Sequence, residues 1–222
     1  MKQEIIDYYD DLASSYDESR FGGTYGRFID GQERKLLAGM LPTGEILELA
    51  CGTGRLSSFA TVACDASRKS LDIATGRCTT ARFACCDAEK LPFRSGHFSA
   101  VFAFHFLMHL ESEAISRVLA EAARVLKPGG VFVVDVLSPG RKRGHNSRQP
   151  WHAATALSLS DLQALAGAAG LRIERHAGIL VLPIQRFPSA LRLQLCQLDM
   201  WLGGVVPFLA SYHVAYMRKG DA

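Results

Sequence analysis

The sequence predicts an α/β fold in which helices alternate with the strands of a parallel sheet. Three observations support this prediction. Short apolar runs alternate along the chain with stretches of helical periodicity. The run from Val131 to Leu137 is typical of a parallel strand covered on both faces. A glycine-rich turn, Gly52-Thr53-Gly54, follows the first strand. Strands that alternate with helices build parallel sheets through right-handed crossovers.

Seven strands are expected, at residues 45–50, 61–65, 81–86, 98–105, 131–137, 171–182 and 212–219. Helical segments are expected between them, at residues 55–59, 67–77 and 113–126. The last of these carries an apolar stripe of Ile115, Val118, Leu119, Ala122 and Leu126. It should end at Lys127-Pro128-Gly129-Gly130, because proline cannot continue a helix and glycine tolerates positive φ. Ser160 and Gln163 predict a capping box for a helix that ends near Gly170.

Two further helical regions stand outside this alternation. Residues 1–42 predict an N-terminal helical cap, with Ile5, Tyr9, Leu12, Ala13 and Tyr16 on one helical face. Residues 187–210 predict an inserted lid helix, whose shared face holds Leu191, Leu195, Leu198 and Leu202. That helix is expected to line an apolar substrate cavity, to form a self-association surface, or simply to pack on the sheet.

Length and composition favour one domain that spans residues 1–222, in which 48% of the residues are hydrophobic. A net charge of +3 is too small to imply nucleic acid or an anionic membrane. The longest apolar region, 191–210, is interrupted by Arg192, Asp199 and Pro207, so no membrane span is expected. The first residues of the sequence lack the basic and then apolar segments of a signal peptide, so none is expected. The six cysteines have no metal-ligand spacing, so we expect free thiols in the cytoplasm and no metal.

Acidic residues follow three successive strands of the predicted sheet. Glu48 precedes the glycine turn, Asp65 ends the second strand, and Asp87 follows the third. Carboxylates at such positions can accept hydrogen bonds from ribose hydroxyls and from an adenine amine. Ser57 stands where a dinucleotide fingerprint needs its third glycine. The three acids therefore indicate a nucleoside-shaped crevice rather than a dinucleotide site, although each alone could be a helix cap or a solvated strand end.

Four ordered motifs in residues 1–140 resemble the class I S-adenosylmethionine-dependent methyltransferases, in particular the small-molecule group that includes quinone C-methyltransferases. The motifs are Glu48-Leu49-Ala50-Cys51-Gly52-Thr53-Gly54, Asp65-Ala66-Ser67, Asp87 to Phe93, and Arg124 to Gly130. The resemblance implies a Rossmann-like, doubly wound, seven-stranded sheet that is mostly parallel, with its last strand antiparallel. It also implies S-adenosylmethionine as the cofactor.

The resemblance further implies the residues that hold this cofactor. The glycine turn would cradle its methionine part, Asp65 its ribose, and Asp87 with Ala88 its adenine, while Tyr16 would close over it from the N-terminal cap. The full expected set is Tyr16, Glu48, Leu49, Ala50, Cys51, Gly52, Gly54, Asp65, Ala66, Asp87, Ala88 and Phe104. The span from Gly54 to Asp65 is short for the family, so the crossover must contain only a turn or two of helix. Cys64 stands where the family often has glycine.

Methyl transfer needs alignment of the reactants, and needs a base only when the acceptor arrives protonated. His105 and His109 follow the fourth strand and are the expected catalytic residues. His109 occupies a position where the family commonly has histidine, and packing beside the cofactor is its favoured role. For His105, base catalysis and a packed, hydrogen-bonded ring are equally compatible with the sequence.

We expect the substrate to be a small, partly apolar metabolite that is methylated on oxygen, nitrogen or carbon, and the protein to be a monomer or homodimer. The basic loop 138–151 offers an alternative, methylation of a macromolecule such as RNA or a peptide. No aromatic residues interleave its basic residues, so the loop does not indicate a stacking platform for nucleic acid. A non-catalytic module that binds S-adenosylmethionine is the other alternative, because a fold does not by itself determine function.

Overall fold

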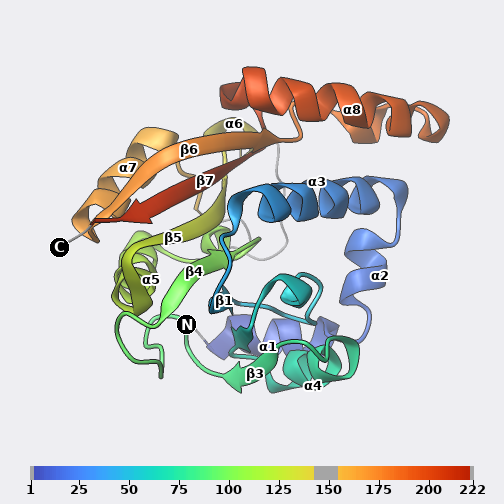
Figure 1. Cartoon of the computed structure of the whole chain (residues 1–222). Coiled ribbons are helices and arrows are strands. Elements are labelled where there is room, and N and C mark those ends of the chain that lie inside the picture. Colours follow the sequence, from blue (N-terminus) through green and yellow to red (C-terminus); the bar gives the residue numbers. More distant parts are fainter. Residues whose placement is uncertain (1–2, 143–154, 221–222) are drawn as a thin grey trace.

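The computed structural model describes residues 3–142 and 155–220 of the chain and has a seven-stranded sheet at its centre (Figure 1). The strand order is β3-β2-β1-β4-β5-β7-β6. β7 runs antiparallel to both of its neighbours, and the other adjacent pairs are parallel. The prediction of a doubly wound, mostly parallel sheet with an antiparallel last strand is therefore confirmed. The strands are β1 (Ile46–Leu49), β2 (Val62–Asp65), β3 (Arg82–Cys85), β4 (Phe98–Ala103), β5 (Leu126–Leu137), β6 (Leu171–Ile179) and β7 (Tyr212–Lys219).

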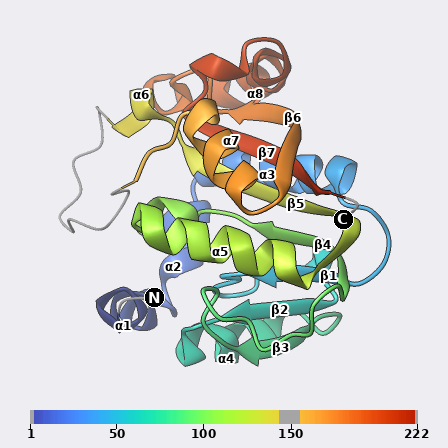
Figure 2. The same ribbon diagram turned by 90° about the vertical axis from the view of Figure 1, so that its left-hand side faces the viewer.

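Helices cover both faces of the sheet (Figure 2). The helices are α1 (Gln3–Leu12), α2 (Tyr16–Phe21), α3 (Thr24–Met40), α4 (Arg68–Arg77), α5 (Ser112–Val125), α6 (Pro139–Lys142), α7 (Leu159–Ala168) and α8 (Ser189–Val205). Single 3-10 turns are η1 (Ser57–Phe59), η2 (Leu107–His109), η3 (Ile184–Arg186) and η4 (Pro207–Leu209). α5 and α7 pack on one face, whereas α3, α4 and α8 lie on the other.

The central strand β5 shows why both faces are covered. Phe132 and Val134 belong to the core beneath α5 and α7, whereas Val131 and Val133 belong to the core beneath α3. All four side chains are almost completely buried. Successive side chains of a strand point to opposite faces, so an apolar strand needs a helical layer on each side. The two layers hold the strand ends, and the loops that follow them, in fixed positions.

The crossover between β1 and β2 contains only the single turn η1 where such crossovers usually carry a full helix. The expectation of a very short crossover is confirmed. β2 nevertheless pairs with β1 in parallel register, with Leu47 beside Val62. The close connection keeps the ends of β1 and β2 next to one another.

Some element boundaries differ from those that the sequence predicts. The capping box of α7 is formed by Ser158 and Asp161, two residues before the predicted pair, because Ser158 satisfies the backbone N–H of Asp161. α5 ends at Val125, and β5 begins at once with Leu126 beside Phe98. The strand therefore includes the predicted Lys-Pro-Gly-Gly turn as an irregular first segment with a shifted register.

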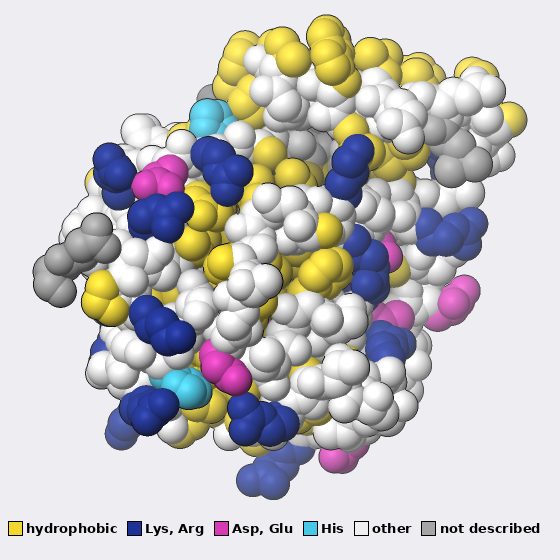
Figure 3. All heavy atoms as spheres, viewed as in Figure 1, with side chains coloured by type: hydrophobic (Ala, Val, Ile, Leu, Met, Phe, Trp, Pro, Cys, Tyr) yellow, Lys and Arg dark blue, Asp and Glu magenta, His cyan; other side chains and the backbone are white. Residues whose placement is uncertain are grey.

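The expected N-terminal cap consists of α1, α2 and α3, and the expected lid helix is α8. α8 packs against β6 and α3, where the backbone of Gly203 lies so close to the Gly178 carbonyl that a Cβ would be 2.2 Å from its oxygen. Figure 3 shows hydrophobic side chains along the outer surface of α8, where Trp201 is 61% exposed. Among the described residues, no helix is long and apolar enough to cross a membrane.

Candidate cofactor site

A pocket lies at the carboxyl ends of β1, β2 and β4, under the N-terminal helices α1 and α2. This is the edge of an open α/β sheet where ligands bind. Its lining residues come from the cap, from the turn after β1, from the ends of β2 and β4 and from the start of α4. They are Ile5, Ile6, Tyr9, Ala13, Tyr16, Asp17, Phe21, Glu48, Ala50, Cys51, Gly52, Thr53, Arg55, Leu56, Asp65, Ser67, Ser70, Phe104, His105, Phe106 and His109.

The turn after β1 depends on residues with positive φ. Ala50, Gly52 and Gly54 have φ values of 52°, 52° and 78°. At Gly54 a Cβ would lie 2.9 Å from the Cβ of Ala74, so the turn packs directly on α4. At Gly52 a Cβ would meet no atom within 4 Å. The turn is therefore closely packed on α4 at Gly54, whereas at Gly52 its backbone is uncovered. A ligand in the pocket could approach the backbone there.

Asp65 holds the same turn from the end of β2. Its Oδ2 accepts a hydrogen bond from the backbone N–H of Gly52 (2.8 Å), and its Oδ1 accepts one from the N–H of Ser67 (2.8 Å). Burial raises the pKa of Asp65, although these backbone donors favour the charged form. The sequence did not predict that Asp65 binds the turn itself. Each carboxylate oxygen has a further acceptor site for a ligand hydroxyl.

Glu48 lies at the base of the pocket, and its side chain is buried. Its Oε2 accepts a hydrogen bond from the Ser57 hydroxyl at 2.5 Å. Burial raises the pKa of Glu48 to about 8, because it outweighs the stabilisation of the charged form by Ser57 and Arg55. A carboxyl with this pKa is mostly protonated at neutral pH and can donate as well as accept a hydrogen bond.

The cap contributes an aromatic wall. Tyr9 of α1 packs edge-on against Tyr16 of α2, and Tyr16 packs in the same way against Phe21. The hydroxyl of Tyr9 and Nε2 of His109 are hydrogen-bonded at 2.9 Å. Burial raises the pKa of Tyr9 and of Tyr16, so both hydroxyls remain neutral. Tyr16 and His109 therefore both belong to this wall of the pocket.

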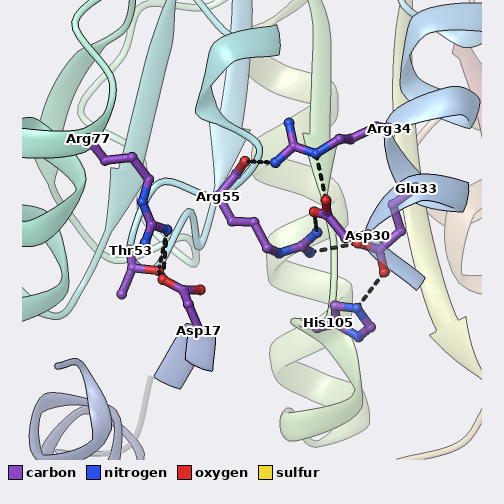
Figure 4. Close-up of polar contacts among 8 residues, drawn as sticks. All are labelled: Asp17, Asp30, Glu33, Arg34, Thr53, Arg55, Arg77 and His105. Atoms are coloured by element: carbon purple, nitrogen blue, oxygen red, sulfur yellow. Dashed lines mark hydrogen bonds and ion pairs between the residues drawn. The ribbon is translucent and has the colours of Figure 1, made fainter. Parts of the chain in front are cut away.

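His105 stands between two buried carboxylates, that of Glu33 (Figure 4) and that of Asp135. Its Nε2 is hydrogen-bonded to Oε1 of Glu33 on α3 at 2.5 Å, and its Nδ1 lies 3.6 Å from Oδ2 of Asp135 on β5. The backbone of His105 has φ 55°, and its N–H donates to Asp135 at 2.7 Å. Burial alone lowers the pKa of His105, but Glu33 and Asp135 outweigh it and the net pKa is raised.

Arg55 connects this histidine to the rest of the cap. It donates to Asp30 and to Glu33, each at 2.6 Å (Figure 4). Burial opposes ionisation of Glu33, but His105 and Arg55 lower its net pKa. Burial raises the pKa of Asp135 to about 6 although His105 favours its charged form. Arg55 and His105 are thus the positively charged or chargeable partners of Glu33 and Asp135 in this buried group, and each carboxylate has such a partner.

The pocket gathers most, but not all, of the predicted residues. Tyr16, Glu48, Ala50, Cys51, Gly52, Asp65, Phe104, His105 and His109 all line it. Leu49 is buried in the core beneath α5, and Gly54 packs on α4. Ala66, Asp87 and Ala88 follow β2 and β3 outside the lining set. None of the described side chains of α8 lines this pocket, so the expected lid helix packs away from it.

Several lining residues escaped the sequence analysis. Arg55 and Asp17 carried a signal, since each directly follows a motif residue, Gly54 and Tyr16. Glu33, which contacts His105 without lining the pocket, carried none, because it reaches His105 only through the packing of α3. The predicted basic loop 138–151 lies mostly outside the described residues. Within the described ranges, no three histidine, cysteine or acidic side chains are grouped as a metal site.

Known proteins with similar sequences are methyltransferases. Residues 47–134 match a methyltransferase domain family. The human protein named Probable tRNA methyltransferase 9B is 32% identical over 135 residues, which cover 57% of this chain and 29% of that protein. A ubiquinone/menaquinone biosynthesis C-methyltransferase from Desulfotalea psychrophila is 35% identical over 147 residues, which cover 60% of this chain and 58% of that protein. The chain thus spans less than two thirds of the length of either relative.

A solved structure agrees over nearly the whole chain. A SAM-dependent methyltransferase from Thermotoga maritima superposes with a TM-score of 0.72 at 19% identity, covering 94% of this chain and 97% of that chain. At this identity the similarity bears on the fold alone. The matched domain contains the glycine turn and the acids that follow β1, β2 and β3. Residues 47–134 therefore form a methyltransferase domain with the fold of the class I S-adenosylmethionine-dependent methyltransferases, whose cofactor is S-adenosylmethionine.

Proposed function

We propose that this protein methylates a small, partly apolar metabolite on oxygen, nitrogen or carbon. The observation that supports the proposal most directly is the enclosure of the pocket by Tyr9, Tyr16 and Phe21 of the cap. A concave pocket with aromatic side chains in its wall suits a small ligand better than a macromolecular surface does. The unpaired state of all six cysteines supports a reducing, cytoplasmic compartment.

The residues of the pocket fit the cofactor of the family. The open side of Gly52 accommodates the methionine part, and the remaining acceptor sites of Asp65 suit ribose hydroxyls. Asp87 and Ala88 do not line the pocket, and their role toward the adenine remains part of this proposal. S-adenosylmethionine, when bound, supplies a methyl group on a positively charged sulfur. Tyr16 and the rest of the aromatic wall exclude water from that end of the site.

His105 is the residue that we propose as proton acceptor, and we assign His109 to packing beside the cofactor. In the neutral ring the proton on Nε2 faces Glu33, which leaves Nδ1 to take a proton from the acceptor group, directly or through one water. Asp135, 3.6 Å from Nδ1, stabilises the imidazolium that results. The carboxylates orient the ring as well, since a hydrogen bond at one nitrogen selects the tautomer.

The proposal is tested with isotope-labelled S-adenosylmethionine and extracts divided into metabolite, peptide and RNA fractions. Label in the metabolite fraction is the expected result. Label in RNA would favour the alternative suggested by the similarity to Probable tRNA methyltransferase 9B, and label in peptide would favour protein methylation. Measured cofactor binding with label in no fraction would favour a non-catalytic binding module. Sedimentation of the same preparation distinguishes a monomer from a homodimer.

A further inference from the structure

Asp17, on α2, has one carboxylate oxygen with polar partners in the protein and one without any among the described residues. Its Oδ2 accepts a hydrogen bond from the Thr53 hydroxyl (2.7 Å) and forms an ion pair with Nη1 of Arg77 (2.6 Å) (Figure 4). Its Oδ1 is buried, and none of the described residues donates a hydrogen bond to it. The carboxylate is thus attached to the glycine turn through Thr53 but has an unused acceptor beside that turn.

A buried carboxylate oxygen without a donor loses its hydration and gains nothing in return. Arg77 compensates the charge of Asp17, but its ion pair is with the other oxygen. Asp17 is one of the residues that line the pocket, together with Gly52 and Thr53. In Figure 4 the unused oxygen points away from Thr53 and Arg77, toward the side of the site where Arg55 and His105 lie. Because Asp17 lines the pocket, a ligand bound there is the donor that we consider.

We propose that Oδ1 of Asp17 binds the α-ammonium group of the methionine part of the cofactor. This inference rests on the proposed function. An ammonium group has three N–H donors, and its hydrogen bond to a carboxylate is strengthened by charge. The bond to Thr53 keeps Asp17 beside the turn that cradles the methionine part. Ribose hydroxyls have their own acceptor in Asp65, at the end of the adjacent strand β2.

The proposal also explains why α2 closes over the site. α2 spans only six residues, Tyr16–Phe21, and contains no fully buried residue. A helix this short is not stable alone, so its position depends on contacts such as those of Asp17. An ammonium group on Oδ1 would add a contact between α2 and the ligand. Ligands that lack the amino-acid part should therefore be held by the strand ends alone.

Calorimetric titration of wild-type protein and D17N with three ligands tests this subsite. The ligands are S-adenosylhomocysteine, its desamino analogue, which lacks only the ammonium group, and methylthioadenosine, which lacks the whole amino-acid part. For D17N, we expect the affinity for S-adenosylhomocysteine to fall about tenfold or more. Affinity for the other two ligands should change less than about threefold. Wild-type protein should bind the desamino analogue about tenfold more weakly than S-adenosylhomocysteine.

T53V is the matched control. This change removes the donor that keeps Asp17 beside the turn but leaves the carboxylate itself, so it should weaken S-adenosylhomocysteine more than the other two ligands, by a smaller factor than D17N does. An equal loss for all three ligands in D17N would overturn the subsite and leave Asp17 with a purely structural role. Wild-type protein that fails to discriminate against the desamino analogue would overturn it as well. Failure of wild-type protein to bind any of the ligands would instead overturn the proposed function itself.

Discussion

The carboxylate of Glu33 and the imidazole of His105, which are 72 positions apart in the chain, are hydrogen-bonded at 2.5 Å. Glu33 comes from the helical cap and is only 1% exposed, whereas His105 follows the central strand β4. The same carboxylate accepts a hydrogen bond from Arg55. The contact therefore joins the helical cap to the edge of the sheet where the strands have their carboxyl ends and where the pocket lies. It also affects the orientation of the His105 ring and the pKa of that ring.

Replacement of Glu33 by glutamine should lower the pKa of His105. The negative charge of Glu33 raises that pKa, and glutamine can retain a hydrogen bond without the charge. A nearby opposite charge shifts a pKa by about 1 unit or more, so a fall of this size is expected. If the neutral ring is the proton acceptor, the acidic limb of the pH profile of kcat/KM moves to lower pH by the same amount. NMR titration of His105 checks the shift independently of activity.

Asp30→Asn is the control for this experiment. Asp30 pairs with Arg55 and Arg34 and has no hydrogen bond to His105, so its loss should move the His105 pKa much less. A His105 pKa that is the same in the wild type and in Glu33→Gln would contradict the role assigned to Glu33.

Replacement of His105 by alanine should lower turnover about tenfold or more, as expected when a positioned base is lost. The affinity for S-adenosylhomocysteine should change little, because the turn and Asp65 lie on other strands. Single-turnover kinetics and calorimetry measure the two effects separately. Equal turnover in the wild type and in His105→Ala would remove His105 from the mechanism. The same measurements on His109→Ala would show whether His109, in the aromatic wall, contributes to catalysis.

Replacement of Glu48 by glutamine should flatten the dependence of stability on pH. The pKa of Glu48 is raised to about 8 in the folded protein, so the folded state retains a proton that the unfolded state releases at lower pH. Wild-type stability therefore has a component that is complete below the unfolded pKa of about 4.3 and is lost as pH rises through about 8. Glutamine has no proton to lose and can still accept from Ser57. Urea unfolding at pH 5 and at pH 8 gives the free energy of unfolding of the wild type and of Glu48→Gln. If this free energy changes equally between the two pH values in both proteins, the result argues against a protonated Glu48.

Replacement of Gly54 by alanine should destabilise the protein by about 1–3 kcal/mol, because φ is 78° and the new Cβ would lie 2.9 Å from that of Ala74. Gly76→Ala, on the same helix as Ala74, is the matched control. A Cβ at Gly76 meets no atom within 4 Å, and alanine should stabilise the helix by about 0.5–1 kcal/mol. Urea unfolding distinguishes the two, and equal effects would contradict the close packing of the turn on α4.

Local sequence patterns predicted a helix or strand well where the residues within that segment are enough to specify it. The stripe of α5 follows from helical periodicity, and Ile115 and Leu119 are fully buried as it requires. Boundaries were less predictable where neighbours compete. Ser158 and Ser160 are equivalent in sequence as helix caps, and the structure selects Ser158 because its hydroxyl reaches the N–H of Asp161. The pairing of Leu126 with Phe98 likewise draws the predicted turn into β5.

The sequence by itself determined the sheet, the glycine turn and the acids at the strand ends, because these depend on backbone conformation and on periodicity within short segments. Only the tertiary structure decided which side chains share the pocket. Glu33 meets His105, and Asp17 meets Thr53, through the packing of the cap on the sheet. Such contacts join residues far apart in the chain, and no local pattern specifies them. For the same reason the structure, and not the sequence, placed α8 against α3 and β6 and left the pocket beneath α1 and α2.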